Sequence, residues 1–166
     1  MMIIADYKNI PSILFTVRSS NLRSHTGEVS FPGGKKDPSD INILDCALRE
    51  VEEEVNIPRS NLQVLGQHNL LLPNKTGTLC VYPFISVLKT PINNINQIKF
   101  NTEEVEKVFF TPIDHLLDQK NMYWKQFRNT SFKGPVFKPQ EGEKEIWGLT
   151  GFILYNCLKT LYPGKF

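Results

Sequence analysis

The stretch GGKKDPSDINILDCALREVEEEVNI, residues 33–57, decides how the rest of this chain is interpreted. The apolar residues of its second half recur every three or four positions: Leu44, Leu48, Val51 and Val55. This spacing lays their side chains along one stripe of a helix, and such a stripe packs against a protein core. The pattern therefore predicts a buried helix over residues 44–55, with Pro58 blocking its continuation.

Three carboxylates of this predicted helix share about one turn: Glu50, Glu53 and Glu54. Like charges at this spacing weaken an isolated helix by about 0.2–0.5 kcal/mol per pair. A hard divalent cation would offset the repulsion, because Mg²⁺ and Mn²⁺ prefer carboxylate oxygens as ligands. For the helix taken alone, a solvated acidic face is the simpler interpretation.

The segment before the helix favours the metal site. The tight turn FPGG, residues 31–34, lets the backbone pass close to a ligand. Two basic residues follow, Lys35 and Lys36, and either Ser39 or Asp40 is a candidate for the start of the helix. A glycine turn, basic residues and a carboxylate helix together suit a metal-bound diphosphate.

Residues 34–57 resemble the Nudix box, G-x5-E-x7-R-E-U-x-E-E-x-G-U, in which U is a bulky apolar residue. The match runs from Gly34 to the segment REVEEEVNI, residues 49–57. One extra residue precedes the helix, so that Asp40 stands near the place of the first glutamate. Asn56 replaces the late glycine, which is a mild change because asparagine also adopts the left-handed conformation at helix ends.

The upstream sequence is similar to a second motif, L-L-T-x-R-S-x3-R-x3-G-x3-F-P-G-G, which accompanies the Nudix box in coenzyme A diphosphatases. The matching residues are LFTVRS at 14–19, then Arg23, Gly27 and the FPGG turn. The resemblance implies an α/β (α+β) Nudix fold, an α/β/α sandwich with a central mixed β-sheet. It also implies hydrolysis of coenzyme A and/or acyl-CoA to 3′,5′-ADP and (acyl-)4′-phosphopantetheine.

Two alternatives to this activity stay open at the level of sequence. One is a Nudix hydrolase of ADP-ribose, a dinucleotide or a capped RNA 5′ end, because substrate choice depends on side chains outside the shared box. The other is a non-catalytic Nudix fold that binds a nucleotide.

The resemblance also assigns roles to individual residues. The metal ligands, for Mg²⁺ or Mn²⁺, are expected to be Glu50, Glu53, Glu54 and the carbonyl of Gly34. Arg49 is expected to pair with a glutamate and hold it in orientation. Either Glu103 or Glu104 resembles a late carboxylate that completes the site, and we favour Glu104; a charged strand end is the alternative.

Substrate contacts are expected from Arg18, Arg23, Gly33, Gly34 and Lys35. A coenzyme A ligand carries a diphosphate and a 3′-phosphate, and arginine donates two parallel hydrogen bonds to a phosphate. We therefore expect at least one of Arg18 and Arg23 to contact a substrate phosphate.

The chain length predicts one domain over residues 1–166, which the resemblance implies is a Nudix domain. Its net charge of +2 gives no bulk argument for nucleic acid, and its three isolated cysteines fit neither a zinc site nor a disulfide framework. Neither an 18-residue apolar run nor a signal peptide is present, so we expect no membrane span and an intracellular protein. The C-terminus is not a Ser-Lys-Leu address, so cytoplasm, mitochondrion and peroxisome stay open, as do monomer and homodimer.

The expected strands are residues 1–5, 12–17, 62–68 and 78–88, the last of them central but containing Pro83. Relatives carry more chain before the first strand, so we expect the N-terminus to be truncated. Residues 118–139 are expected to form a long irregular loop whose aromatic residues tether it to the core or stack on adenine. A short helix is expected at residues 113–117 and a longer one at residues 146–158.

Overall fold

The computed structural model describes residues 1–22, 24–69, 72–73, 80–126 and 133–165. Within these ranges the core is a six-stranded sheet with the order β3-β2-β1-β7-β4, and β8 pairs with β2. Its strands are β1 Met2–Tyr7, β2 Ile10–Arg18, β3 Val29–Ser30, β4 Leu62–Gln67, β7 Phe84–Leu88 and β8 Val105–Pro112. Strands β1 and β7 run parallel and the other pairs antiparallel, so the predicted mixed sheet is confirmed.

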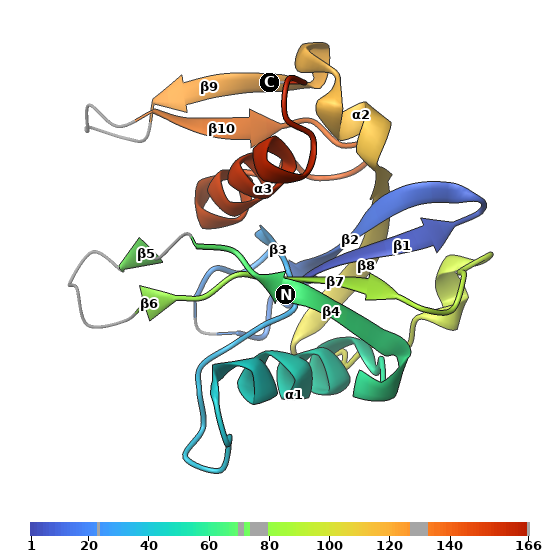
Figure 1. Cartoon of the computed structure of the whole chain (residues 1–166), viewed down its shortest axis with the longest axis vertical. Coiled ribbons are helices and arrows are strands. Elements are labelled where there is room, and N and C mark those ends of the chain that lie inside the picture. The colour runs from blue at the N-terminus through green and yellow to red at the C-terminus, as the bar shows by residue number, and fades with distance from the viewer. Residues whose placement is uncertain (23, 70–71, 74–79, 127–132, 166) are drawn as a thin grey trace.

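Helices cover both faces of this sheet (Figure 1). Helix α1, Ile43–Val55, lies on one face, and α3, Gly148–Leu161, lies on the other. Successive side chains of a strand point to opposite faces, and β2 shows the result. Leu14 packs in the cluster that contains Val51 of α1, whereas Phe15 packs in the cluster that contains Leu154 of α3.

The N-terminal cap of helix α1 lies two residues after Asp40, the later of the two predicted starts. Its cap is Asn42, whose side chain accepts a hydrogen bond from the Asp45 amide at 2.9 Å. The expectation of Ser39 or Asp40 was therefore wrong, because Asp40 is buried and accepts hydrogen bonds from Arg49 instead. At the other end Asn56 adopts the left-handed conformation, with φ of 51°, as its position in the box predicts.

Strands β1 and β2 form a hairpin, and both are longer than expected. Only Lys8 and Asn9 remain between them, and their φ angles of 54° and 63° are those of a two-residue turn that matches strand twist. The strands expected at residues 1–5 and 12–17 thus extend toward each other, with β1 ending at Tyr7 and β2 beginning at Ile10.

The strand predicted at residues 78–88 is broken. Strand β6, Cys80–Val81, pairs with β5, Leu72–Pro73, whereas β7 lies between β1 and β4 in the main sheet. Pro83 falls in the break, where the missing N–H costs no ladder hydrogen bond. The central position predicted for this segment holds for β7. Residues 78–79 lie outside the described residues.

The segment expected to be a long irregular loop contains a hairpin, so that expectation was wrong. Strands β9, Met122–Gln126, and β10, Lys133–Phe137, pair antiparallel beside α3. The Tyr123 hydroxyl donates to Glu145, and the Trp124 ring meets the Tyr155 ring edge-on. These contacts tether the described aromatics within their own layer; Phe127, Arg128 and Phe132 lie outside the described residues.

The remaining elements are short. They are α2 Ile113–Leu117, which was predicted, and three 3₁₀ turns, η1 Arg59–Asn61, η2 Ile95–Gln97 and η3 Gln119–Asn121. Across the described ranges, none of the helices is both long and apolar enough to cross a membrane.

Candidate active site

Three carboxylates from two distant segments converge beside the sheet. Oxygens of Glu50, Glu54 and Glu104 all lie within 4.8 Å of one another. Helix α1 supplies the first two, and the turn before β8 supplies the third. That turn is fixed by two backbone hydrogen bonds: the Asn101 amide donates to Glu54 O at 3.0 Å, and the Ser19 amide donates to Glu104 O at 2.9 Å. Glu104, which the sequence favoured over Glu103, therefore joins this cluster.

Glu54 is the most deeply buried member, with 4% of its surface exposed. Burial raises the pKa of its carboxyl to about 7, and the nearby charge of Glu50 adds to this effect. Two groups act in the opposite direction. The Gly33 amide donates to Glu54 Oε2 at 3.2 Å, and an Arg18 guanidinium nitrogen lies 4.0 Å from Oε1. A further positive charge would stabilise the ionised form.

Glu50 faces the second glycine of the turn. A Cβ added at Gly34 would lie only 2.4 Å from Glu50 Oε1, so the absence of a side chain at residue 34 makes room for this carboxylate. Burial raises the pKa of Glu50, and the neighbouring Arg49 counteracts the shift. The Gly34 carbonyl accepts a long contact from Cys46 Sγ at 4.0 Å, and its role as a metal ligand stays a prediction.

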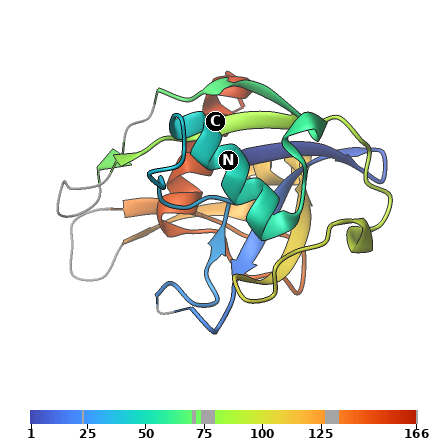
Figure 2. The ribbon, with the colours of Figure 1, turned by 90° about the horizontal axis from the view of Figure 1, so that it is seen from below.

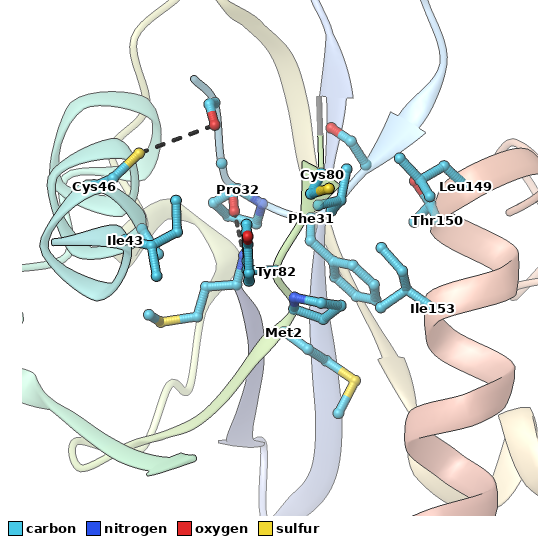
Figure 3. Close-up of a pocket in the computed structure, with 17 residues that line it drawn as sticks. Met2, Phe31, Pro32, Ile43, Cys46, Cys80, Tyr82, Leu149, Thr150 and Ile153 are labelled. Atoms are coloured by element: carbon cyan, nitrogen blue, oxygen red, sulfur yellow. Dashed lines mark hydrogen bonds between the residues drawn. The ribbon is translucent and has the colours of Figure 1, made fainter. Parts of the chain in front are cut away.

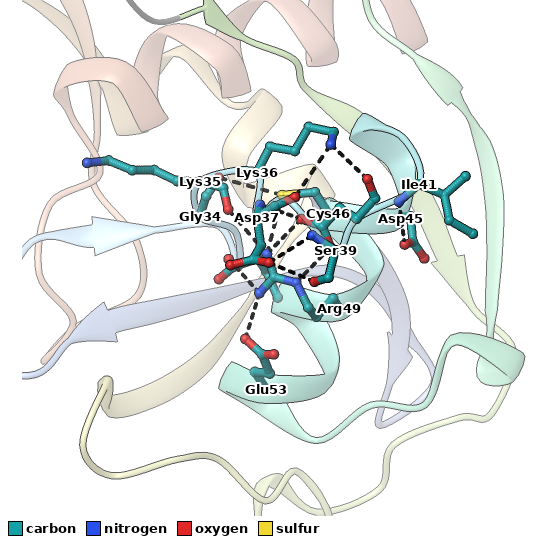
Figure 4. A network of polar contacts seen from close by, with 12 residues as sticks. Gly34, Lys35, Lys36, Asp37, Ser39, Ile41, Asp45, Cys46, Arg49 and Glu53 are labelled. Atoms are coloured by element: carbon teal, nitrogen blue, oxygen red, sulfur yellow. Dashed lines mark hydrogen bonds and ion pairs between the residues drawn. The ribbon is translucent and has the colours of Figure 1, made fainter.

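Arg49 lies at the centre of a polar network (Figure 4). Its Nε and Nη2 donate to the two oxygens of Asp40 at 2.8 and 3.0 Å, a bidentate pair that lowers the pKa of the Asp40 carboxyl. Its Nη1 lies 3.0 Å from Glu50 and 2.8 Å from Glu53. Arg49 thus contacts two glutamates, where one was expected, and it also binds Asp40, which is not among the predicted site residues.

Asp40 could have been found from the sequence. It stands near the place of the first glutamate of the box, displaced by the one extra residue before the helix. Its shorter side chain reaches Arg49 because the preceding loop folds back, with the Asp37 amide donating to Asp40 at 2.7 Å.

The other predicted site residues lie around this cluster. The side chain of Glu53 is 49% exposed and pairs with Arg49, so its role as a metal ligand stays a prediction. Lys35 is exposed, and its carbonyl accepts from Arg49 at 3.2 Å. Arg23 lies outside the described residues.

The donor set fits a hard divalent cation. Glu50, Glu54 and Glu104 supply the carboxylate oxygens that Mg²⁺ and Mn²⁺ prefer. Burial penalises the ionised forms of Glu50 and Glu54, and a cation between them would remove that penalty.

Comparison with known proteins identifies the family. The NUDIX domain profile matches residues 2–131. The chain is 35% identical to the mitochondrial coenzyme A diphosphatase NUDT8 of Mus musculus over 161 residues, which cover 95% of this chain and 74% of that protein. It is 38% identical to the uncharacterized Nudix hydrolase NudL of Photorhabdus laumondii over 147 residues, covering 88% and 75% of the two chains.

Among solved structures, the Nudix hydrolase RenU of M. smegmatis shares the fold, with a TM-score of 0.55 and 18% identity over 70% of each chain. The fold and the site define a Nudix enzyme, a hydrolase of small nucleotide derivatives. The chain belongs to the Nudix hydrolase family.

Proposed function

We propose that the protein hydrolyses the diphosphate of coenzyme A and/or acyl-CoA, giving 3′,5′-ADP and (acyl-)4′-phosphopantetheine, with Mg²⁺ or Mn²⁺ as the metal. One observation carries the proposal: the segment that resembles the coenzyme A diphosphatase motif supplies the neighbours of Glu54. Arg18 and Gly33, from that segment, approach the two oxygens of this carboxylate. The 35% identity to a coenzyme A diphosphatase supports the same substrate.

The chemistry assigned to the site is attack of water on a phosphoanhydride. A bound divalent cation supplies charge neutralisation and a lowered pKa for water. Glu50, Glu54 and Glu104 hold the cation, and Arg49, anchored on Asp40, fixes the orientation of Glu50 and Glu53. Arg18 faces a phosphate of the substrate. A carboxylate of the site accepts the proton of the attacking water as its oxygen bonds to phosphorus. The bridging P–O bond of the anhydride breaks at the same phosphorus, and the other phosphate leaves with the bonding electron pair.

The test is a hydrolysis panel with products identified by mass. Free coenzyme A, an acyl-CoA, ADP-ribose, a dinucleotide and a capped RNA are each incubated with Mg²⁺, with Mn²⁺ and with a chelator. We expect metal-dependent release of 3′,5′-ADP from coenzyme A or its thioester. Cleavage of ADP-ribose, the dinucleotide or the capped RNA alone would assign the protein to another Nudix substrate. If no compound on the panel turned over, a nucleotide-binding Nudix fold without catalysis would replace the proposal.

A further inference from the structure

An apolar cavity of about 280 Å³ opens between the two helices, next to the FPGG turn (Figure 3). Ile43 of α1 lies on one side of it, and Leu149 and Ile153 of α3 lie on the other. Between them are Met2 of β1 and Cys80 of β6. The cavity is therefore built from both layers of the sandwich, and its size approaches that of small-molecule pockets.

The cavity adjoins the carboxylate cluster through the glycine turn. Gly33 and Gly34 line it, and these residues also contact the cluster. The Gly33 amide binds Glu54, and Gly34 faces the Glu50 carboxylate. A substrate whose diphosphate lies at the cluster can therefore extend one of its two arms past the glycine turn and into the cavity.

The chemistry of the lining decides which arm enters. Most of the lining side chains are aliphatic, aromatic or sulfur-containing. Several of its polar groups are already paired: Ser30 Oγ with Thr16 Oγ1 at 2.9 Å, and Pro32 O with the Met1 amine at 2.5 Å. An adenine buried here would have ring nitrogens without hydrogen-bond partners, which costs free energy. An alkyl chain has no hydrogen-bonding groups and carries no such cost.

The nucleotide arm of the substrate has a better binding partner outside the cavity, which is Arg18. Arg18, at the end of β2, lies 4.0 Å from Oε1 of Glu54, whereas Gly33 of the cavity lining binds Oε2. Arg18 is not among the residues that line the cavity. Its guanidinium suits the phosphates of the ADP half, which the apolar lining does not.

We infer that this cavity is the subsite for the acyl-thioester end of the substrate, and that it makes the protein selective for acylated over free coenzyme A. The inference rests on the proposed function, since it needs a substrate with an ADP arm and a pantetheine arm. Burial of an aliphatic chain strengthens binding by about two- to fourfold per methylene group. KM should therefore fall as the acyl chain lengthens, until the cavity is filled.

Two side chains of the cavity allow a sharp test. All three cysteines are among the described residues, and Cys80, in the cavity wall, is exposed while Cys46 and Cys157 are buried. The rate at which iodoacetamide alkylates Cys80 therefore reports on occupancy. Leu149 lies in the first turn of α3, where an aspartate is compatible with the helix. Because the Leu149 side chain is 49% exposed, replacing it with aspartate should have a limited effect on folding. Leu65, 53% exposed on β4, is a matched control outside the cavity.

The labelling experiment uses the full chain with Glu54→Gln, to slow turnover, in the presence of Mg²⁺. Octanoyl-CoA, which has no free thiol, is expected to slow alkylation of Cys80 several-fold at saturation, and 3′,5′-ADP is expected to leave the rate unchanged. Equal protection by 3′,5′-ADP would show that the nucleotide arm occupies the cavity and would overturn the inference. The absence of protection by octanoyl-CoA would overturn it as well.

The kinetic experiment compares the ratio of kcat/KM for octanoyl-CoA to kcat/KM for free coenzyme A. Leu149→Asp is expected to lower this ratio by about tenfold, because a charge replaces an apolar contact, and Leu65→Asp is expected to keep it. An unchanged ratio in Leu149→Asp contradicts the subsite. If the unmutated protein cleaves neither compound, the proposed function itself fails, and that result is visible before any variant is made.

Discussion

Gly34 lies so close to Glu50 that a Cβ at residue 34 would sit 2.4 Å from the Glu50 Oε1 oxygen. This close approach places the glycine turn directly against the Glu50 side chain of helix α1. The atoms in the way belong to the end of a flexible side chain, so they can move without disturbing the backbone. Gly34 is therefore needed to position the Glu50 carboxylate, and it matters less for the stability of the fold.

Gly34→Ala is therefore expected to damage activity more than stability. The new methyl group displaces the Glu50 carboxylate, and a misplaced ligand weakens both metal binding and the chemical step. We expect kcat/KM to fall by about tenfold or more, whereas the midpoint of urea unfolding in chelator changes little. A variant that unfolds readily but keeps full activity when folded would contradict this account of Gly34.

Glu54→Gln keeps the shape of the side chain and removes its charge. We expect kcat with Mg²⁺ to fall by about two orders of magnitude, the size of effect seen when one electrostatic catalytic group is lost. Glu52→Gln is the matched control on the same helix, because Glu52 pairs with Arg59 away from the cluster. Near-normal turnover in Glu54→Gln would remove Glu54 from the proposed metal site.

The buried Glu54 also predicts how stability depends on pH in metal-free protein. Its folded pKa of about 7 lies above the ordinary value of 4.5, so the folded state holds more protons than the unfolded state between these pH values. The free energy of unfolding therefore falls as the pH rises from about 4.5 to 7, by on the order of 3 kcal/mol through this group.

Urea unfolding at pH 5 and pH 7.5 measures this effect, with Glu54→Gln as the reference that lacks the titrating group. The wild-type protein should lose stability relative to the variant at the higher pH. Mg²⁺ should restore it, because the cation binds only the folded state. Identical pH dependence in the two proteins would contradict the assignment.

Arg18→Ala tests the phosphate contact. A hydrogen bond between charged groups contributes about 1.5–3 kcal/mol, and the partial exposure of Arg18 reduces this, so KM for coenzyme A should rise by about three- to tenfold. The rise should exceed that for a plain dinucleotide if the 3′-phosphate is the target. Arg59→Ala is the control. Arg59 follows the end of α1 and binds two residues of that helix, Asp45 and Glu52, which are not members of the carboxylate cluster. An unchanged KM in Arg18→Ala would reject the contact.

The sequence predicted helix α1 well because its signals are local. Apolar spacing, the three glutamates and Asn56 all act within one helix. The start of the helix was less predictable, since Asn42 and Asp40 can both cap a helix. What separates them is the pairing of Asp40 with Arg49, a contact across nine residues that forms only when the loop folds back.

The long-range parts of the structure needed more than local signals. Glu104 reaches the site through its position before β8, and its chemistry alone did not distinguish it from Glu103. The β9–β10 hairpin was missed because its aromatic and basic residues lack a clear alternation. The apolar cavity combines segments from both ends of the chain, so no single stretch of sequence predicts it.

Crystals of the protein soaked in Mn²⁺ test the central claim most directly. Anomalous scattering should place an ion about 2 Å from carboxylate oxygens of Glu50, Glu54 and Glu104, and Glu54→Gln crystals treated in the same way should show a weaker peak or none. A wild-type map without an ion at these side chains, from protein that also cleaves nothing with Mn²⁺ in solution, would contradict it.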